Sequence, residues 1–463
     1  MADADAFRRY LADARARHLD ELCAWLRIPS ISTLPEHARD MAAAAAWAAD
    51  QMRAVGLEHV AIMPTGGHPV VYGDWLHAPD RPTLLVYGHY DVQPADPLEL
   101  WQSPPFSPEI RDGRLFARGA SDDKGQIFMH LKAAEALRDL DGTPPINLKF
   151  IIEGEEECGS ENLARYVAAE AGRLACDVAA VSDSPLLGPE VPSLCESLRG
   201  ITTLELTLRT GVSDLHSGLY GGSAPNALHV LAELLASLHD DQGRVTVPGF
   251  YDAVRPLTPA ERAAYAALPF DETGFRAEIG APALTGEEGY TIVEQIWRRP
   301  TLELNGLWGG FQGTGTKTVI PCVAHAKISC RLVPDQDPEQ IAELVAAHAR
   351  RLCPPTATVE VGGQGGGHPA LTPRDHPAMQ AAARAMAIAY GREPVFAGMG
   401  GSIPVVPMLQ RTLGAPVVLI GFGLNGEHFH APNEFFTLSN FDRGLLTLCL
   451  FYEGLAGMSP GAR

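Results

Sequence analysis

Short apolar runs alternate with helical patterns towards both ends of the chain, and this alternation restricts the fold more than any other feature. The segment 124–140 has the apolar spacing of a helix. Strands that alternate with helices form parallel, helix-covered sheets, so we predict an α/β domain with a mainly parallel sheet. The apolar runs that are typical of its buried strands are "TLLVYG" (83–88), "INLKFIIE" (146–153), "DVAAVSD" (177–183) and "PVVLIGFG" (416–423).

The middle of the chain has a different pattern, in which apolar and polar residues alternate. This pattern is typical of a sheet with one solvated face. The helical segment 225–238 is suited to cover the other face, so we predict an α+β domain here. The alternating segments are "GITTLELTLRTG" (200–211), "AHAKISCRLVPD" (324–335) and "ATVEVGG" (357–363).

The length of 463 residues also favours more than one domain. We expect the first domain to consist of residues 1–199 and 371–463, with residues 200–370 inserted as the α+β domain. The glycine-rich segment "GGQGGGHPA" (362–370) is typical of a flexible connection, and we place the second boundary there.

Histidine and carboxylate side chains follow each of the predicted strands of the first domain. Ligands of open α/β sheets bind beyond the carboxyl ends of strands, so these side chains are expected at one edge. Taken singly, each has an ordinary structural explanation, such as an aspartate that caps a helix. Those explanations do not account for all of them at one edge. The residues are His89 and Asp91; Asp122 and Asp123 before the predicted helix; Glu155, Glu156 and Glu157; Asp183; and Glu427, His428 and His430.

Imidazole nitrogens and carboxylate oxygens are the ligands that zinc prefers, and two zinc ions can share one carboxylate. Two such ions about 3.5–4 Å apart form a known hydrolytic centre. Three ligand carboxylates and one bridging hydroxide would balance their charge and leave a further glutamate free to act as a base. The residues at the sheet edge therefore predict a centre with two divalent metal ions.

Composition excludes some partners. The formal net charge of −20 disfavours nucleic acids and anionic membranes, and the sequence has no apolar run long enough to span a bilayer. The N-terminus lacks the pattern of a secretion signal, so we expect a cytoplasmic protein.

The eight cysteines include no CxxC pair and indicate reduced thiols. The segment 309–318 lacks phosphate-loop spacing, because Thr316 separates Gly315 from Lys317.

A series of motifs resembles those of the carnosinase-like and cytosolic nonspecific dipeptidases. These are di-zinc metallopeptidases, related to the aminoacylases and glutamate carboxypeptidase. The resemblance implies a zinc-exopeptidase-like first domain, a lid and dimerisation role for residues 200–370, and a homodimer. In chain order the motifs are "GHYDVQP", "GASDDKG", "EGEEECGS", "VSDS", "DLHSGLYGG", "CRLVPDQ", "GGSIPVV" and "HAPNE".

The resemblance also implies a role for each metal-site residue. The peptide bond before Asp123 is expected to be cis. The bound metal is expected to be zinc, although manganese and cobalt accept similar ligands. The implied ligands are His89 and Asp183 for one ion, Glu157 and His430 for the other, and Asp122 as the carboxylate that both ions share.

The glutamate block determines how the motif is aligned. In the most consistent alignment Glu156 is the general base and Glu157 is the metal ligand. Glu155 then has no implied role, and a shift by one residue would change both assignments. Asp91 is implied to orient the ring of His89.

Further residues are implied to act on the substrate. His216 resembles a donor to the oxyanion that reaches the active site of the partner subunit. Arg331 resembles the arginine that binds the free carboxylate of the peptide, and Thr318 and Ser402 match other substrate contacts.

We therefore expect a metal-dependent dipeptidase. An N-acyl or N-carbamoyl amino-acid amidohydrolase, or a glutamate-carboxypeptidase-like exopeptidase, would use the same metal chemistry. A non-catalytic binding protein on this scaffold would have lost a ligand or the base, and none is missing from the sequence.

Overall fold

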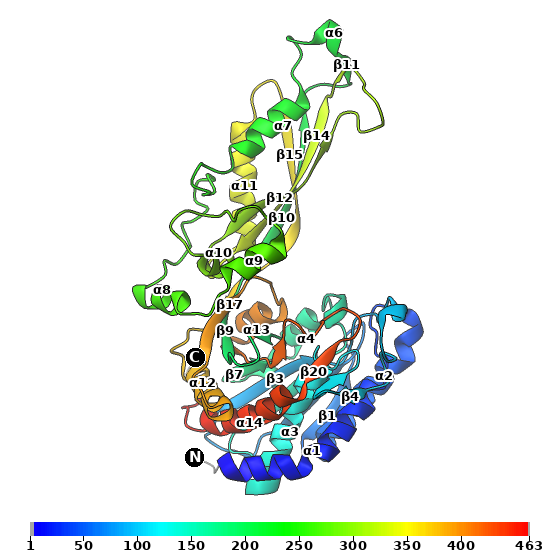
Figure 1. The fold of residues 1–463 in the computed structure, drawn as a ribbon, viewed down its shortest axis with the longest axis vertical. Coiled ribbons are helices and arrows are strands. Elements are labelled where there is room, and N and C mark those ends of the chain that lie inside the picture. Colours follow the sequence, from blue (N-terminus) through cyan, green and yellow to red (C-terminus); the bar gives the residue numbers. More distant parts are fainter. Residues whose placement is uncertain (1–3, 462–463) are drawn as a thin grey trace. The chain divides into compact units, whose positions relative to one another are not determined.

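The computed structural model describes residues 4–461, which form two compact units (Figure 1). The first unit contains the chain up to Glu196, the segment Thr372–Ala397 and the chain from Met408 onward. The second unit contains Ser197–Leu371 and the short piece Gly398–Pro407. The first domain expected from the sequence, residues 1–199 and 371–463, includes this short piece.

The first unit is built on a mixed sheet with strand order β1-β2-β6-β3-β7-β18-β9. The central strands β6, β3, β7 and β18 are parallel, whereas β1, β2 and β9 are antiparallel to their neighbours. The α/β class is thus confirmed, and the parallel part is confined to the centre of the sheet. The strand bounds are Glu58–Met63 (β1), Val70–Trp75 (β2), Thr83–His89 (β3), Asn147–Glu153 (β6), Val178–Val181 (β7), Ser193–Leu198 (β9) and Val417–Leu419 (β18).

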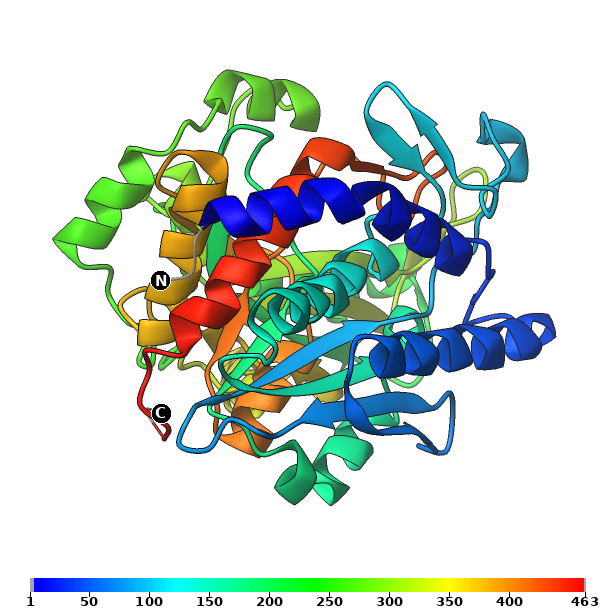
Figure 2. The ribbon, with the colours of Figure 1, turned by 90° about the horizontal axis from the view of Figure 1, so that it is seen from below.

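The central strands are apolar because they are covered on both faces. Every residue of β6 after Asn147 and every residue of β3 after Thr83 is buried, which is typical of parallel strands. Helices α1, α3 and α14 pack side by side in this unit (Figure 2). The helix bounds are Ala4–Leu26 (α1), Ala38–Ala54 (α2), Lys124–Asp141 (α3), Leu163–Ala169 (α4), Ala171–Leu174 (α5), Pro377–Tyr390 (α12), Val405–Leu413 (α13) and Leu438–Leu455 (α14).

Short strands form two smaller sheets in the first unit. Strand β20 pairs with β5, which pairs with β4, and β19 pairs with β8. Helix α3, which follows the predicted acidic pair, ends at Gly142, whose φ of 78° favours glycine. The bounds of the short strands are Glu109–Arg111 (β4), Arg114–Phe116 (β5), Pro185–Leu186 (β8), Gly423–Leu424 (β19) and Phe435–Thr437 (β20). No helix within residues 4–461 has the length and apolar character needed to cross a membrane.

The second unit contains an antiparallel sheet with strand order β12-β14-β10-β15. Burial alternates strictly along most of β10, as the sequence predicts for a sheet with one solvated face. The buried face packs against α7 and α11, with Leu206 and Val345 in the shared core. The bounds are Gly200–Arg209 (β10), Thr301–Gly309 (β12), Val323–Leu332 (β14), Thr358–Gly367 (β15), Ala227–Ala236 (α7) and Pro338–Leu352 (α11).

Smaller elements complete the second unit. Helices α8 and α10 each begin with a capping box, formed by Thr258 with Glu261 and by Thr291 with Glu294. Strand β11 pairs with β13. The bounds are Leu215–His216 (β11), Val319–Ile320 (β13), Ser217–Tyr220 (α6), Pro259–Ala266 (α8), Glu272–Ile279 (α9) and Ile292–Arg298 (α10).

The prediction that residues 362–370 form a flexible connection is wrong. Most of this segment belongs to β15, which pairs with β10 over its length. The glycines serve close backbone approach: a Cβ on Gly366 would lie 2.2 Å from the backbone oxygen of Ile201. Gly365 has a φ of 83°, and the strand register shifts near this point. Glycine is needed here for a bulge in a paired strand.

Candidate metal centre

The predicted metal ligands meet at the carboxyl edge of the first unit's central sheet. They come from segments that are far apart in the sequence, as expected where parallel strands end together. His89 is the last residue of β3, Asp183 follows β7, Glu157 follows β6, Asp122 precedes α3, and His430 lies in the loop between β19 and β20.

Among the described residues, two groups have the geometry to hold a metal ion, and Asp122 belongs to both. One group adds His89 and Asp183, the other adds Glu157 and His430, and the ligand atoms within each group lie within 4.8 Å of one another. Oδ1 of Asp122 lies 3.1 Å from Nε2 of His89, and Oδ2 lies 2.9 Å from Nε2 of His430. Each oxygen of Asp122 thus faces a different group, which is the arrangement of a bridging carboxylate.

The electrostatics of these groups favour a cation. Burial raises the pKa of Asp183, and the neighbouring carboxylate of Asp122 adds to this rise. Contacts with Asp122 and Glu157 raise the pKa of His430 to about 10. A divalent cation would relieve the repulsion between these carboxylates and take the place of the protons on the imidazoles. Carboxylate oxygens and imidazole nitrogens are the ligands that zinc prefers. The residues present therefore fit the two metal ions that the sequence analysis expects.

Asp91 connects the two groups. Its backbone oxygen lies 3.1 Å from Nδ1 of His89, and its Oδ1 lies 3.4 Å from the same nitrogen. Its Oδ2 accepts a hydrogen bond from the backbone N–H of Glu157 at 3.0 Å. Gln93, which the sequence analysis did not single out, donates to Oε2 of Glu157 at 2.8 Å. Such contacts fix the orientation of ligand side chains.

The neighbouring glutamates have different environments. Glu155 is buried and accepts hydrogen bonds from the backbone N–H of His68 at 2.8 Å and from the side chain of Asn162. It therefore anchors two loops, which is the role that the sequence left open. Within the described chain, the carboxylate of Glu156 has no hydrogen-bond partner. Burial raises the pKa of Glu156 to about 7, with His89 opposing the rise and Glu157 adding to it.

The start of α3 departs from an ordinary helix cap. The Asp122–Asp123 peptide bond is cis, as the resemblance implies. Asp123 occupies the N-cap position, but its side chain does not cap the helix. Its Oδ2 instead accepts a hydrogen bond from the backbone N–H of His89 at 3.1 Å. The capping explanation for the acidic pair is therefore wrong for Asp123.

The predicted substrate residues lie in the second unit. His216 ends β11 and is exposed, and its Nδ1 accepts a hydrogen bond from the backbone N–H of Gly218 at 3.0 Å. Thr318 is also exposed, and its backbone oxygen accepts a hydrogen bond from Ser217 at 3.1 Å. These contacts place His216 and Thr318 on adjoining segments, because β11 pairs with the strand that follows Thr318.

Arg331 and Ser402 are brought together although they are distant in the sequence. Nη1 of Arg331 donates to Oγ of Ser402 at 3.3 Å, and that Oγ donates to the backbone oxygen of Arg199 at 2.5 Å. Burial lowers the pKa of Arg199 to about 10, and the charge of Arg331 adds to this effect. Arg199 was not predicted. Two neighbouring guanidinium groups form a cationic position that is suited to an anion.

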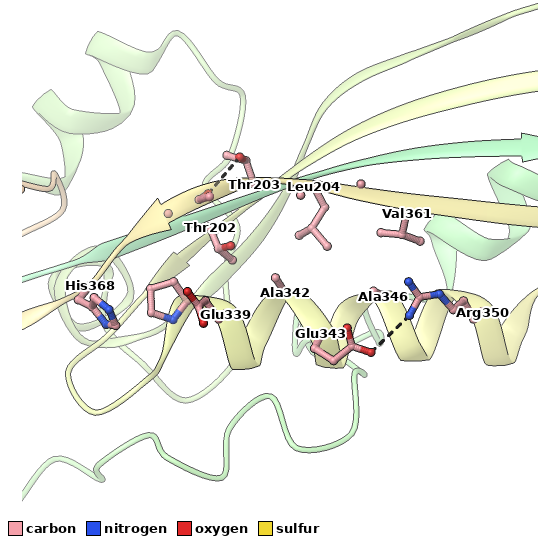
Figure 3. A pocket seen from close by; sticks show the side chains of 15 residues that line it. Thr202, Thr203, Leu204, Glu339, Ala342, Glu343, Ala346, Arg350, Val361 and His368 are labelled. Atoms are coloured by element: carbon pink, nitrogen blue, oxygen red, sulfur yellow. Dashed lines mark hydrogen bonds and ion pairs between the residues drawn. The ribbon is translucent and has the colours of Figure 1, made fainter. Parts of the chain in front are cut away.

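A separate pocket of about 440 Å³ lies in the second unit between α11 and the strands β10 and β15 (Figure 3). The glycines of β15 line it, and the ion pair between Glu343 and Arg350, at 3.3 Å, lies along α11. None of the predicted metal or substrate residues lines this pocket. It therefore carries no part of the candidate centre.

Comparisons with known proteins agree with the site. The sequence model of peptidase family M20/M25/M40 matches residues 85–453. The "Cys-Gly metallodipeptidase dug1" of Schizosaccharomyces pombe is 33% identical over 398 residues, which are 85% of this chain and 84% of that protein. The human "Beta-Ala-His dipeptidase" is 31% identical over 460 residues, which are 95% of this chain and 91% of that protein.

Solved structures show the same fold. An M20-family metallo-carboxypeptidase from Sulfolobus solfataricus superimposes with a TM-score of 0.78 and 32% sequence identity, covering 95% of this chain and 99% of that chain. The resemblance stated from the sequence motifs is thereby confirmed.

Proposed function

Because the chain belongs to peptidase family M20/M25/M40, we propose that it hydrolyses dipeptides with the help of two divalent metal ions. The observation that carries this proposal is the pair of ligand groups that share Asp122. His89 and Asp183 would hold one ion, and Glu157 and His430 would hold the other. We propose zinc as the metal, with manganese or cobalt as possible substitutes.

Two ions bound in this centre would polarise the scissile carbonyl and increase the acidity of a water molecule. Glu156 is the group that accepts the proton of this water and then transfers it to the leaving amine. Its carboxylate has no hydrogen-bond partner within the described chain, and burial raises its pKa to about 7, close to neutral pH. Asp91 keeps the ring of His89 in place.

Substrate recognition is proposed to involve the second unit. Arg331 and Ser402 would bind the free carboxylate of the peptide, and Thr318 would form a further substrate contact. The hydrogen bond between Arg331 and Ser402 supports a joint role, and the nearby guanidinium of Arg199 strengthens the local positive charge.

We also propose that the active form is a homodimer in the cytoplasm, with His216 supplied by the partner subunit as a donor to the oxyanion. Large apolar side chains near His216 are exposed: the exposed fraction is 76% for Leu219 and 46% for Tyr220. Exposed apolar side chains of this size are typical of an interface. Residues 200–370 would then act as the lid and dimerisation domain.

A carboxypeptidase acting on longer peptides is the second candidate. It is favoured by the similarity to the metallo-carboxypeptidase of Sulfolobus solfataricus. An N-acyl or N-carbamoyl amino-acid amidohydrolase would use the same metal residues and would differ in its substrate contacts.

A substrate panel tests the proposal. The purified protein is assayed with zinc, manganese or cobalt on dipeptides, including Cys-Gly and β-Ala-His, on longer peptides and on N-acyl and N-carbamoyl amino acids. We expect the highest kcat/KM on dipeptides, and no turnover after the metal is removed by a chelator. Turnover restricted to acylated amino acids, or to longer peptides, would contradict the dipeptidase assignment.

A further inference from the structure

Glu434 is a buried carboxylate that binds the backbone of the segment before α3. Its Oε1 accepts hydrogen bonds from the backbone N–H groups of Ser121 at 2.9 Å and Asp122 at 3.1 Å. Its Oε2 accepts one from the backbone N–H of Gly119 at 3.0 Å. Hydrogen bonds to a charged acceptor are stronger than those between neutral groups. One side chain therefore fixes the backbone of a segment that has no regular secondary structure.

Arg118 completes this arrangement. Its Nη1 donates to Oε2 of Glu434 at 2.7 Å, its Nη2 donates to the backbone oxygen of Pro94, and its side chain is 1% exposed. The backbone oxygen of Glu434 also accepts a hydrogen bond from Ala117 at 3.1 Å. Removing one member of a buried ion pair leaves the other uncompensated, so the segment depends on both members.

Glu434 lies at the end of the loop that carries His430. His428, His430 and Asn433 have φ angles of 62°, 59° and 63°, which are unfavourable for residues other than glycine. Such a backbone persists only where surrounding contacts hold it. Asp122 and His430, whose side chains lie 2.9 Å apart, are thus on two irregular segments that the carboxylate of Glu434 joins.

The remaining ligands are supported differently. His89 is the last residue of the buried strand β3, and Asp183 follows the buried strand β7. The sheet itself fixes these two positions. Asp122 belongs to both ligand groups. In the group with Glu157, both Asp122 and His430 lie on segments that Glu434 joins, whereas in the other group only Asp122 does.

We propose that Glu434 is a positioning residue that fixes Asp122 close to His430. It thereby determines the affinity of the metal ion held by Glu157 and His430, here called the second ion. This inference rests on the two-metal function proposed above. It predicts that loss of the Glu434 carboxylate weakens one ion selectively and leaves the ion at His89 and Asp183 bound.

The test uses the full-length protein after removal of metal. Wild type, Glu434→Gln and a control are titrated with cobalt(II), followed by calorimetry and by the visible absorption of the bound ion. The control is Glu196→Gln. Glu196 is also a buried carboxylate paired with an arginine, Arg374, and this arginine lies 2.6 Å and 2.9 Å from its oxygens. Glu196 lies in β9, a strand that carries none of the five proposed metal ligands, so its loss reports on general stability.

We expect two bound ions in wild type and in Glu196→Gln. In Glu434→Gln we expect one ion at wild-type affinity and a second weakened about tenfold to a hundredfold, the usual effect of losing a residue that orients a ligand. Two ions at wild-type affinity in Glu434→Gln would overturn this inference alone, as would an equal loss in Glu196→Gln. Fewer than two ions in wild type would overturn the proposed function and this inference with it.

Arg118→Lys provides a second variant should Glu434→Gln fail to fold. Lysine keeps the charge but cannot donate to Glu434 and to Pro94 as the guanidinium does. A smaller weakening of the second ion, again without loss of the first, supports the inference. Wild-type binding of both ions would overturn it.

Discussion

Three consecutive glutamates show that a residue's environment, not its type, determines what it can do. Glu155 is buried and hydrogen-bonded to two loops, so it serves structure. Glu157 lies 3.2 Å from Nε2 of His430 and belongs to a ligand group. Glu156, between them, has no hydrogen-bond partner in the described chain and has a pKa raised to about 7 by burial. Its free carboxylate is available for proton transfer.

Replacement of Glu156 by glutamine is therefore expected to lower kcat by roughly 10²–10⁴-fold, because a positioned general base contributes about that much. Metal content and melting temperature should stay at wild-type values, since Glu156 makes no hydrogen bond that holds the fold. Steady-state assays together with metal analysis check both statements.

The matched control is Glu155→Gln. It removes the charge that accepts hydrogen bonds from His68 and Asn162, so the melting temperature should fall while metal content is kept. If Glu155→Gln lost its turnover while keeping its metal, and Glu156→Gln lost bound metal, the alignment of the glutamate block would be wrong by one residue.

His130 gives a prediction about pH. Its ring nitrogens lie 2.6 Å from Oγ of Ser182 and 2.8 Å from the hydroxyl of Tyr452. Burial lowers the pKa of His130 from 6.5 to about 3. Between these values the unfolded chain binds more protons than the folded protein, so stability from this residue is complete above pH 6.5 and declines as the pH falls towards 3.

We expect metal-free His130→Gln to lose less stability than metal-free wild type between pH 7 and pH 4.5, because glutamine does not titrate. Melting temperatures of both proteins at the two pH values measure this difference. Equal losses would show that His130 does not contribute to acid sensitivity.

The candidate metal ligands could be predicted from the sequence, but the residues that position them could not. The ligands could be proposed because each follows or precedes a recognisable element; they are His89, Asp122, Glu157, Asp183 and His430. Gln93, Arg199 and Glu434 could not, because their function depends on contacts with segments that only the folded chain brings close. Glu434, for example, binds the amide of a residue 312 positions away.

Among the elements, β15 shows where a composition rule fails. Its glycines were interpreted as a flexible connection, since glycine favours mobile segments. In the structure they let β15 pair closely with β10. The helix at 124–140 and the strand at 200–211 were predicted correctly, because their apolar periodicity is long and regular.

Alanine substitutions at two glycines of β15 test whether the glycines are needed for close pairing with β10 or for chain flexibility. A Cβ on Gly366 would lie 2.2 Å from the backbone oxygen of Ile201, whereas a Cβ on Gly362 would meet nothing within 4 Å. Gly366→Ala should cost about 1–3 kcal/mol through overpacking, and Gly362→Ala should be neutral or stabilising by about 0.4–1 kcal/mol.

Melting temperatures of the two variants provide the measurement. A larger loss for Gly366→Ala confirms that the segment is a packed strand. Equal and small effects at both positions would contradict the close pairing with β10.

At the scale of the whole molecule, the proposed dimer predicts that two inactive variants restore activity when their subunits are mixed. Glu156 and His216 lie in different units of the chain, and His216 is proposed to act in the partner's active site. Glu156→Gln and His216→Ala should each be nearly inactive. A mixture that has exchanged subunits should regain about a quarter of wild-type activity, because half of the dimers are mixed and each has one complete site.

The control for this experiment is a mixture of Glu156→Gln with Asp91→Asn, both altered in the first unit. In the proposed dimer Glu156 and Asp91 of one chain serve the same site. One site of the mixed dimer therefore carries Glu156→Gln and the other carries Asp91→Asn, so neither site is complete and no gain is expected. Recovery in neither mixture, with subunit exchange verified, would contradict the role of His216 across subunits.

The central claim is that His89, Asp122, Glu157, Asp183 and His430 bind two metal ions that share Asp122. A crystal structure of the zinc-loaded protein, with anomalous data collected on both sides of the zinc absorption edge, tests it most directly. The account predicts two zinc peaks about 3.5–4 Å apart, one beside His89 and Asp183 and the other beside Glu157 and His430. A single peak, or peaks bound by other residues, would contradict it.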